Sequence, residues 1–340
     1  MSKQLFINTF RELILRYRHV VIVSHVNPDG DAIGSSLALY YFLLKLGVDA
    51  KVVIPNDFPS FLSWMPGIDE ILIFDKNAEK GIEYLNAADL ICYLDFNAPP
   101  RTGLMHNDLC HCKKTPRLLI DHHRDTDFSQ FVAYLSEVET SSTSELVAEL
   151  IQHYGFDKYL DDNIATCLLV GIMTDTGSFS HSIYHSETFE ICGKLISPTV
   201  NYQLIHSKIY NTFSENRMRL LGFCISSRMT ILNEYNAAYI YLNKTDLETF
   251  NYQIGDTEGV VNFPLMIDTI RLSVLITERQ GVIRFSFRSK GDFSVHEIAK
   301  EHFGGGGHTN AAGGTMNCTI EQAIEKFLTI LPQYKSLLNK

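Results

Sequence analysis

Residues 20–47 read VVIVSHVNPDGDAIGSSLALYYFLLKLG, and the fold prediction starts from this stretch. The apolar run 20–23 is typical of a buried strand, and it ends in a polar segment rich in turn-forming residues. Residues 32–46 have the length and apolar content of a buried helix, and Gly47 is a typical residue just beyond a helix C-terminus. A strand followed directly by a helix predicts the first half of a βαβ unit.

The same alternation continues through the first half of the chain. An amphipathic helix at the N-terminus would bury Leu5, Phe6, Phe10, Leu13 and Ile14. Further strands are predicted at 51–54, 71–74, 90–94 and 118–120, and further helices at 143–154 and 163–173. Strands that alternate with helices predict an α/β domain with a parallel sheet.

The second half has a different pattern, which predicts a smaller α+β domain. Strands are expected at 229–232, 238–242, 272–277 and 282–287, and helices at 245–250, 260–267, 295–303 and 320–331. We therefore expect a catalytic, metal-binding domain at 1–190, a helical linker at 191–222 and a substrate-binding domain at 223–340. At roughly 150 residues per domain, 340 residues suit two domains.

Composition excludes several classes of protein. The 29 Lys and Arg against 39 Asp and Glu give a net charge of −10, which argues against a basic surface that grips long nucleic acid. No apolar run approaches the roughly 18 residues of a membrane span, and the N-terminus lacks a signal-peptide core. Seven scattered cysteines, with no metal-binding pair to complete Cys110-His111-Cys112, predict a reduced cytoplasmic protein without structural zinc.

Acidic and imidazole side chains follow three of the predicted strands. The first strand runs into a segment containing His25, Asp29 and Asp31, the strand 90–94 into Asp95, and the strand 118–120 into Asp121-His122-His123. Each group also has a purely structural explanation: Asn27-Pro28-Asp29-Gly30 is good turn chemistry, and Asp31 could cap the following helix. Because ligands of open α/β sheets bind beyond the carboxyl ends of strands, we expect the three groups to meet at one edge.

Asp175, in the segment GIMTDTG at the end of a buried helix, adds a fourth carboxylate. At that position it needs a nearby cation, either a metal or a Lys or Arg side chain. The set of four carboxylates and two imidazoles suits Mn²⁺ or Mg²⁺ better than structural zinc. Six ligands favour a two-metal site with one bridging carboxylate, a site suited to phosphoester hydrolysis. The six residues are His25, Asp29, Asp31, Asp95, His122 and Asp175.

A second group of interest is the glycine run in residues 304–314, GGGGHTNAAGG. It is either a flexible turn or a backbone cradle for a phosphate, with His308 directly behind the glycines. Arg288, at the end of a predicted strand, is either a phosphate-binding fork or a solvated arginine.

Taken together, these motifs resemble the DHH phosphoesterase family. SHVNPDGDAIGSSLAL, YLDFN, DHHRD and GIMTDTGSF match the four motifs of the DHH domain in order, and GGGGHTNAAGG matches the signature of the associated C-terminal domain. The resemblance covers essentially the whole chain and is strongest to NrnA-type nanoRNases. It implies an enzyme that hydrolyses very short oligoribonucleotides, roughly two to five nucleotides long, to nucleoside monophosphates, and 3′-phosphoadenosine 5′-phosphate to AMP.

The resemblance also implies roles for individual residues. His25, Asp29 and Asp95 would hold one Mn²⁺, and Asp31, Asp95, His122 and Asp175 the other, with Asp95 as the bridge; Mg²⁺ or Co²⁺ could replace Mn²⁺. His123 would face the scissile phosphate. A terminal phosphate or the substrate backbone would be bound by Arg288, Gly306, Gly307, His308 and Asn310. The active site would then lie in a cleft between the two domains.

Some alternatives stay open. Relatives within the family cleave linear or cyclic di-adenylate, and a non-catalytic nucleotide sensor could use the same fold. After Gly177 the chain reads Ser-Phe-Ser-His-Ser where relatives often carry an arginine, so no substrate contact is assigned to Ser180 or His181. The expected partners are short RNA or nucleotides, neither long nucleic acid nor a membrane, and the resemblance is compatible with a homodimer.

Overall fold

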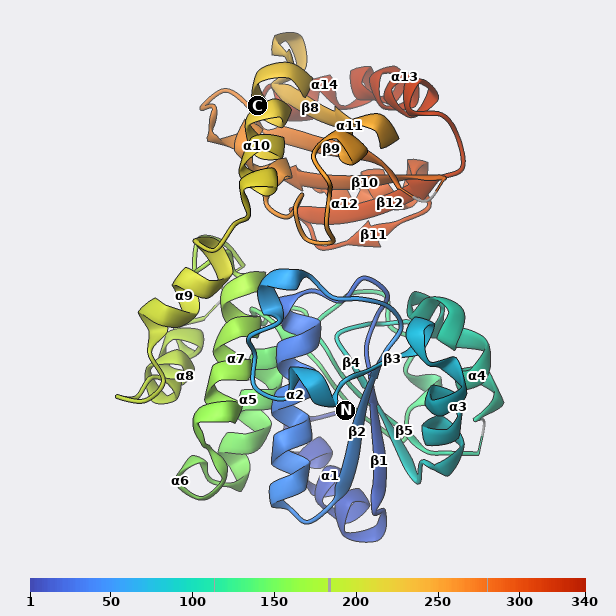
Figure 1. Ribbon diagram of the computed structural model, residues 1–340, viewed down its shortest axis with the longest axis vertical. Coiled ribbons are helices and arrows are strands. Elements are labelled where there is room, and N and C mark those ends of the chain that lie inside the picture. Colours follow the sequence, from blue (N-terminus) through green and yellow to red (C-terminus); the bar gives the residue numbers. More distant parts are fainter. Residues whose placement is uncertain (113, 183–184, 280) are drawn as a thin grey trace. The chain divides into compact units, whose positions relative to one another are not determined.

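The computed structural model describes residues 1–112, 114–182, 185–279 and 281–340. The chain forms two compact units, Met1–Thr212 and Phe213–Lys340 (Figure 1). The expected linker, 191–222, is divided between them. Its first part contains the end of α8 (Glu187–Leu195) and α9 (Tyr202–Tyr210) in the first unit, whereas α10 (Glu215–Phe223) belongs to the second.

The first unit contains a six-stranded parallel sheet in the order β3-β2-β1-β4-β5-β6. Its strands are β1 (His19–Val23), β2 (Asp49–Ile54), β3 (Leu72–Ile73), β4 (Leu90–Leu94), β5 (Arg117–Asp121) and β6 (Ala133–Ser136). The predicted parallel α/β fold is confirmed. The strand order reverses between β1 and β4, and a reversal of this kind is where open α/β sheets bind ligands.

Helices cover both faces of this sheet (Figure 1). Alternate residues of β1 point to opposite faces: Val20 and Ile22 pack in one apolar core and Val21 and Val23 in another. The first core includes α1 (Lys3–Arg16), α2 (Gly30–Lys45), α5 (Thr143–Tyr154) and α7 (Asp162–Asp175). The second includes α3 (Ala78–Ala87) and α4 (His106–His111), and a short helix α6 (Phe156–Tyr159) follows α5.

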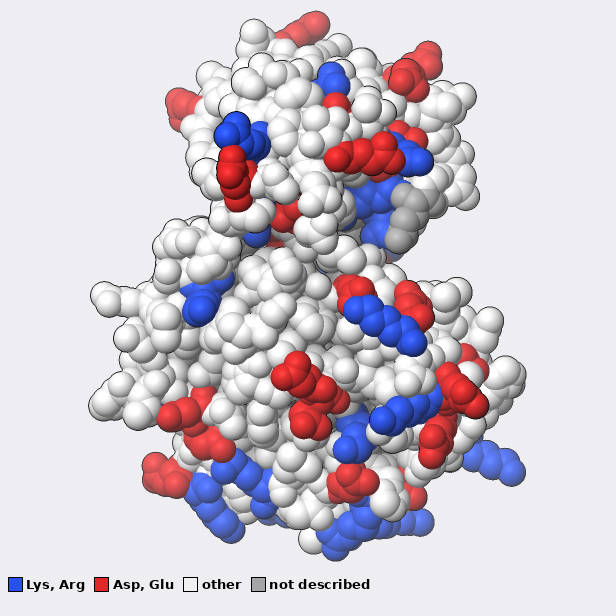
Figure 2. Space-filling model, in the orientation of Figure 1, with Lys and Arg blue, Asp and Glu red and all other residues white. Residues whose placement is uncertain are grey.

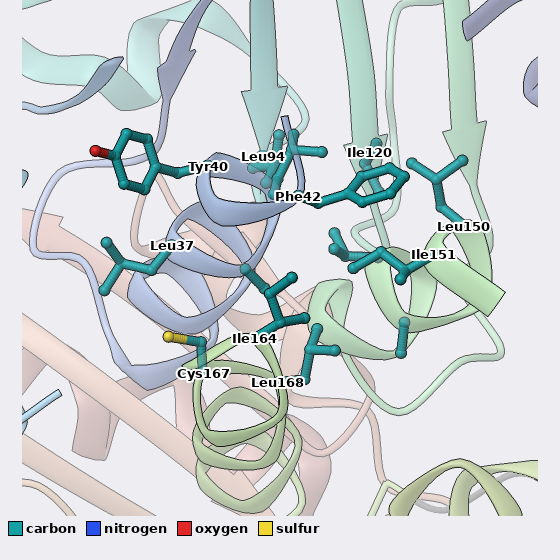
Figure 3. Packing of buried hydrophobic residues seen from close by; sticks show 14 of the residues in the cluster. Leu37, Tyr40, Phe42, Leu94, Ile120, Leu150, Ile151, Ile164, Cys167 and Leu168 are labelled. Carbon is teal, nitrogen blue, oxygen red and sulfur yellow. The ribbon is translucent and has the colours of Figure 1, made fainter. Parts of the chain in front are cut away.

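Close packing of the helices α2, α5 and α7 positions the site. Apolar side chains from these helices, among them Leu37 of α2 and Leu168 of α7, form one layer beside the sheet (Figure 3). Near the C-terminus of α7, Gly171 packs so closely against the first turns of α2 and α5 that no side chain fits there. A Cβ atom there would lie 1.9 Å from Oγ of Ser144 and 2.8 Å from Oδ1 of Asp31. This contact brings the N-termini of α2 and α5 against the last turns of α7.

The second unit is built on a mixed sheet in the order β11-β12-β10-β9-β8-β7, in which only the β8–β9 pair is parallel. Its strands are β7 (Met229–Leu232), β8 (Ala237–Leu242), β9 (Leu272–Arg279), β10 (Val282–Ser289), β11 (Gly306–Gly307) and β12 (Ala311–Met316). One apolar core lies under α12 (Val295–His302) and α13 (Ile320–Ile330), and another involves α10 and α11 (Lys244–Thr249). The chain ends in α14 (Lys335–Leu338). The helix predicted at 260–267 is present as the 3₁₀ helix Val260–Met266, which contains Pro264 and is not an α-helix.

Two further expectations can be compared with the described residues. None of the described helices combines the length and the apolar character needed to cross a bilayer. All seven cysteines are free thiols.

Candidate metal centre

The site begins where β1 and β4 end, at the reversal of strand order. His25 follows β1 and Asp95 follows β4, and the His25 Nε2 atom lies 3.4 Å from Oδ2 of Asp95. The backbone of Asp95 is left-handed, with φ of 65°, while its N–H still donates to the carbonyl of Ile120 at 3.1 Å. A non-glycine residue in this conformation is strained, and such strain occurs preferentially at functional sites.

The structure brings all six predicted ligand residues together in two groups. One group is His25, Asp29 and Asp95, and the other is Asp31, His122 and Asp175. Within each group, the atoms that could bind a metal lie within 4.8 Å of one another. The groups adjoin at Asp95, because the Nε2 atom of His122 lies 3.6 Å from its Oδ1. Asp95 therefore lies where a bridging carboxylate is expected.

Hydrogen bonds orient the two histidines. The Nδ1 of His25 donates to the carbonyl of Val26 at 2.9 Å, which leaves Nε2 to face Asp95. His122 hydrogen-bonds the backbone of Thr140, and its Nε2 lies 3.5 Å from Oδ2 of Asp175. Burial lowers the pKa of both imidazoles below the ordinary value, which favours the neutral form. A neutral imidazole fixed through one nitrogen is the usual arrangement of a histidine metal ligand.

Backbone amides hold the carboxylates at the N-termini of two helices. Both oxygens of Asp31 accept N–H groups at the start of α5, from Thr143 at 2.7 Å and from Ser144 at 2.8 Å. Asp29 accepts the N–H groups of Asp31 and Ala32, each at 3.0 Å. The N-cap of α2 is therefore Asp29, and the expectation that Asp31 caps this helix was wrong because the helix begins at Gly30.

The donor set fits divalent cations. Asp31 and Asp95 are 1% and 2% exposed, and burial raises the pKa of Asp31 to about 7. Burial, followed by the charge of Asp31 and other carboxylates, raises the pKa of Asp95 well above its ordinary value. Buried carboxylates packed this closely repel one another and have lost their hydration, so nearby positive charge is needed to stabilise their ionised forms. Carboxylate and imidazole donors in two adjoining groups match what a pair of Mn²⁺ or Mg²⁺ ions requires.

Three residues at this site were given no role from the sequence. Buried Asp121 accepts a hydrogen bond of 2.7 Å from Nδ1 of His123 and so orients that ring. The hydroxyl of Thr143 donates to Oδ1 of Asp95 at 3.0 Å. Arg101 lies near the site, because its carbonyl accepts the N–H of Val26, next to His25, at 2.7 Å. Burial and then the positive charge of Arg101 lower the pKa of His123 well below its ordinary value. Only Asp121 had a signal in the sequence, namely its place in the DHH triplet.

The glycine run of the second unit has a structural explanation of its own. A Cβ atom on Gly305 would lie 1.8 Å from the carbonyl oxygen of Gly313, so the chain must lack a side chain there to approach β12. Gly306 and Gly307 form β11, and His308 begins the turn into β12, where its N–H donates to the carbonyl of Ala311 at 2.7 Å. Close strand packing thus accounts for Gly305 without a ligand.

The other residues predicted to bind substrate lie beside this turn. Arg288 is in β10, opposite Ala311 of β12, and is half-buried. The side-chain amide of Asn310 donates to the Ser289 hydroxyl at 2.9 Å and to the Gly291 carbonyl at 2.8 Å, so its nitrogen holds the loop. The structure therefore gathers the predicted residues of the second unit at one edge of its sheet, and their contact with substrate stays a prediction.

Comparison with known proteins assigns both units. Residues 19–172 match the DHH family, N-terminal domain, and residues 235–336 match the DHHA1 domain. The bifunctional oligoribonuclease and PAP phosphatase NrnA of Thermus thermophilus is 28% identical over 317 residues, which cover 91% of this chain and 88% of that protein. The cyclic-di-AMP phosphodiesterase GdpP of Bacillus subtilis is 27% identical over 343 residues, 96% of this chain but 49% of that protein.

Solved structures agree with this assignment. An exopolyphosphatase-related protein from Bacteroides fragilis superposes with a TM-score of 0.92 at 40% identity, and all of both chains is covered. RecJ from Thermus thermophilus in complex with Mn²⁺ has a TM-score of 0.54 at 14% identity, covers 98% of this chain and 54% of its own, and shows the fold alone. The similarity to NrnA and GdpP supports a hydrolase. The chain belongs to the DHH phosphoesterase family and consists of a DHH domain followed by a DHHA1 domain.

Proposed function

We propose that this chain is a metal-dependent phosphoesterase that hydrolyses very short oligoribonucleotides to nucleoside monophosphates, and 3′-phosphoadenosine 5′-phosphate to AMP. The observation that carries the proposal is the pair of adjoining acid and histidine groups that meet at the buried Asp95. The similarity to NrnA across nearly the whole length of both chains supports this choice of substrate.

The six residues of the candidate metal centre would hold two divalent ions, Mn²⁺ in the first instance and Mg²⁺ or Co²⁺ as substitutes. When bound, such a pair of ions supplies an activated water and stabilises the charge that develops on the phosphoryl group. His123, whose Nδ1 is hydrogen-bonded to Asp121, would contact a phosphoryl oxygen. Arg101 would add positive charge for the same anionic group.

The second unit would bind the end of the substrate. Arg288, the backbone at Gly306 and Gly307, and His308 would contact a terminal phosphate, while Asn310 keeps the loop in shape. A short substrate also agrees with the surface. In Figure 2, acidic and basic side chains are interspersed on the face in view, and no broad basic area of the kind that binds long nucleic acid is seen there.

A second candidate function is cleavage of cyclic di-adenylate, favoured by the similarity of 96% of this chain to part of GdpP.

To test the proposed function, purified protein is incubated with end-labelled RNAs of two, three, five and twenty-four nucleotides. Phosphoadenosine phosphate, cyclic di-adenylate and pyrophosphate are assayed in parallel, each with Mn²⁺ and with a chelator. We expect metal-dependent release of monophosphates, fastest from the shortest RNAs. Turnover of cyclic di-adenylate alone would favour the second function, and tight binding without any turnover would indicate a sensor.

A further inference from the structure

Strand β10 has two unlike faces. Ile283, Phe285 and Phe287 are buried in the core under α12 and α13. The alternate residues Arg284 and Arg288, with Ser286 between them, are half-buried on the opposite face. Because side chains alternate along a strand, both arginines project from the same side of the sheet.

The guanidinium group of Arg284 lacks a counterion within the described chain. Its Nε atom is buried and has no hydrogen-bond partner, and no ion pair to Arg284 is formed by the described residues. A partly buried cation without a carboxylate is unfavourable unless an anion arrives. Structural arginines normally show the opposite: Arg228 of the same unit binds Asp246 through two nitrogens, at 2.9 and 2.7 Å.

A second arginine increases the positive charge at this place. Arg279, at the end of β9, donates to the hydroxyl of Thr257 and lies 4.6 Å from the ring centroid of Tyr252. Burial and the charge of Arg284 lower the pKa of Arg279, against the opposing influence of Tyr252 and of nearby carboxylates. Thr277 of β9 lies directly opposite Arg284 and is two residues from Arg279, so both arginines are on the same face of the sheet. A bound phosphate would relieve the repulsion between the two cations.

Arg284 and Arg288 are too far apart along β10 to bind the same phosphate group. Four residues of strand separate Arg284 from Arg288, on the order of 13 Å. Side chains stand roughly perpendicular to a sheet, so the guanidinium groups are too far apart to share one phosphate. Between them lies the small residue Ser286, and its neighbour in β12 is Gly313, which has no side chain.

We propose that Arg284, with Arg279 beside it, binds a second phosphate group of an oligonucleotide whose first phosphate is bound at Arg288. The inference rests on the proposed function and deepens it, because it names the substrate class: oligonucleotides long enough to reach from Arg288 to Arg284. Such substrates gain an interaction that 3′-phosphoadenosine 5′-phosphate cannot make. The DHHA1 unit then discriminates by the number of phosphates and not by the bases.

The test measures binding in chelator, where no hydrolysis occurs. Fluorescence anisotropy measures the affinities of 5′-phosphorylated RNAs of two to five nucleotides. The affinity of 3′-phosphoadenosine 5′-phosphate is measured by its displacement of the longest RNA. Arg284→Gln should weaken the binding of the longest RNA about tenfold. It should also reduce the slope of log affinity against log salt by about 0.7, the value for one lost contact to a single strand. The binding of 3′-phosphoadenosine 5′-phosphate should not change.

The control is Arg219→Gln, which makes the same charge change at an exposed residue of α10 that is paired with Glu215. It should bind every ligand as the wild type does. A second variant covers the case in which Arg284→Gln folds poorly. Thr315 of β12 is exposed and lies directly opposite Arg284. Thr315→Glu therefore supplies an intramolecular carboxylate and should weaken the binding of the longest RNA, whereas Thr315→Gln should not.

Two results would overturn the inference. One is wild-type binding of the longest RNA by both Arg284→Gln and Thr315→Glu. The other is an equal loss of affinity for 3′-phosphoadenosine 5′-phosphate in Arg284→Gln, which would place Arg284 at the first phosphate. Failure of the proposed function is seen separately, as absence of hydrolysis by the wild-type protein with Mn²⁺, because the binding comparison does not depend on turnover.

Discussion

Replacing Thr143 by valine should weaken metal binding at the candidate centre. The Thr143 hydroxyl is fully buried and donates to Oδ1 of Asp95 at 3.0 Å, and valine has nearly the same shape without the donor. A hydrogen bond to a charged group contributes about 1.5–3 kcal/mol, which corresponds to roughly a 10- to 100-fold change in affinity. Loss of a residue that orients a metal ligand has effects of the same size.

The assay is calorimetric titration of Mn²⁺ into metal-free protein, followed by the Mn²⁺ dependence of hydrolysis. Thr143→Ser keeps the donor and should bind Mn²⁺ nearly as the wild type does. Thr277→Val makes the same chemical change at a buried threonine of the second unit and should leave the affinity unchanged. If Thr143→Val binds Mn²⁺ within about twofold of the wild type, the hydroxyl does not hold Asp95 in place for a metal, and the reasoning is refuted.

Three further predictions follow from the first unit. Asp95→Ala should lower kcat on a dinucleotide at least about 10²–10³-fold and abolish any Mn²⁺-induced rise in Tm; near-full activity would contradict the two-metal assignment. Gly171→Ala should lower the free energy of unfolding by about 1–3 kcal/mol in a denaturant titration, because its new methyl group meets Ser144 and Asp31; an unchanged midpoint would contradict that packing. Burial raises the pKa of Cys92 to about 12, so the thiol is protonated at pH 8 and should react with iodoacetamide only after unfolding, as mass spectrometry of the labelled peptides would show.

Elements with a strong local pattern could be predicted from the sequence. The continuous apolar strands of the first unit and the helices α2, α5 and α7 were confirmed because burial on both sides leaves a long run of apolar residues. Strands β11 and β12 were missed, since glycine has low intrinsic strand preference. Pairing with β10 holds β12 extended, and pairing with β12 holds β11 extended. Strand β6, four residues long with alternating burial, gave too short a pattern to recognise.

The candidate site was predictable to the extent that it depends on strand order. Parallel strands place their carboxyl ends at one edge, so the residues that follow β1, β4 and β5 had to lie near one another once the sheet was recognised. Asp175 was placed in the site by its residue type and by the motif around it, although it lies on a helix.

What the sequence alone determined is therefore the set of candidate ligand residues and the edge of the sheet at which they meet, because both depend on local apolar runs and their order. The supporting contacts were decided only by tertiary structure. Asp31 binds amides of Thr143 and Ser144, 112 and 113 residues away. Among the described residues Arg284 forms no ion pair, and Glu278 of the neighbouring strand β9 lies opposite Ile283, whose side chain is on the other face of the sheet. Such contacts depend on how helices and strands pack in three dimensions, and packing leaves no periodic pattern in the chain.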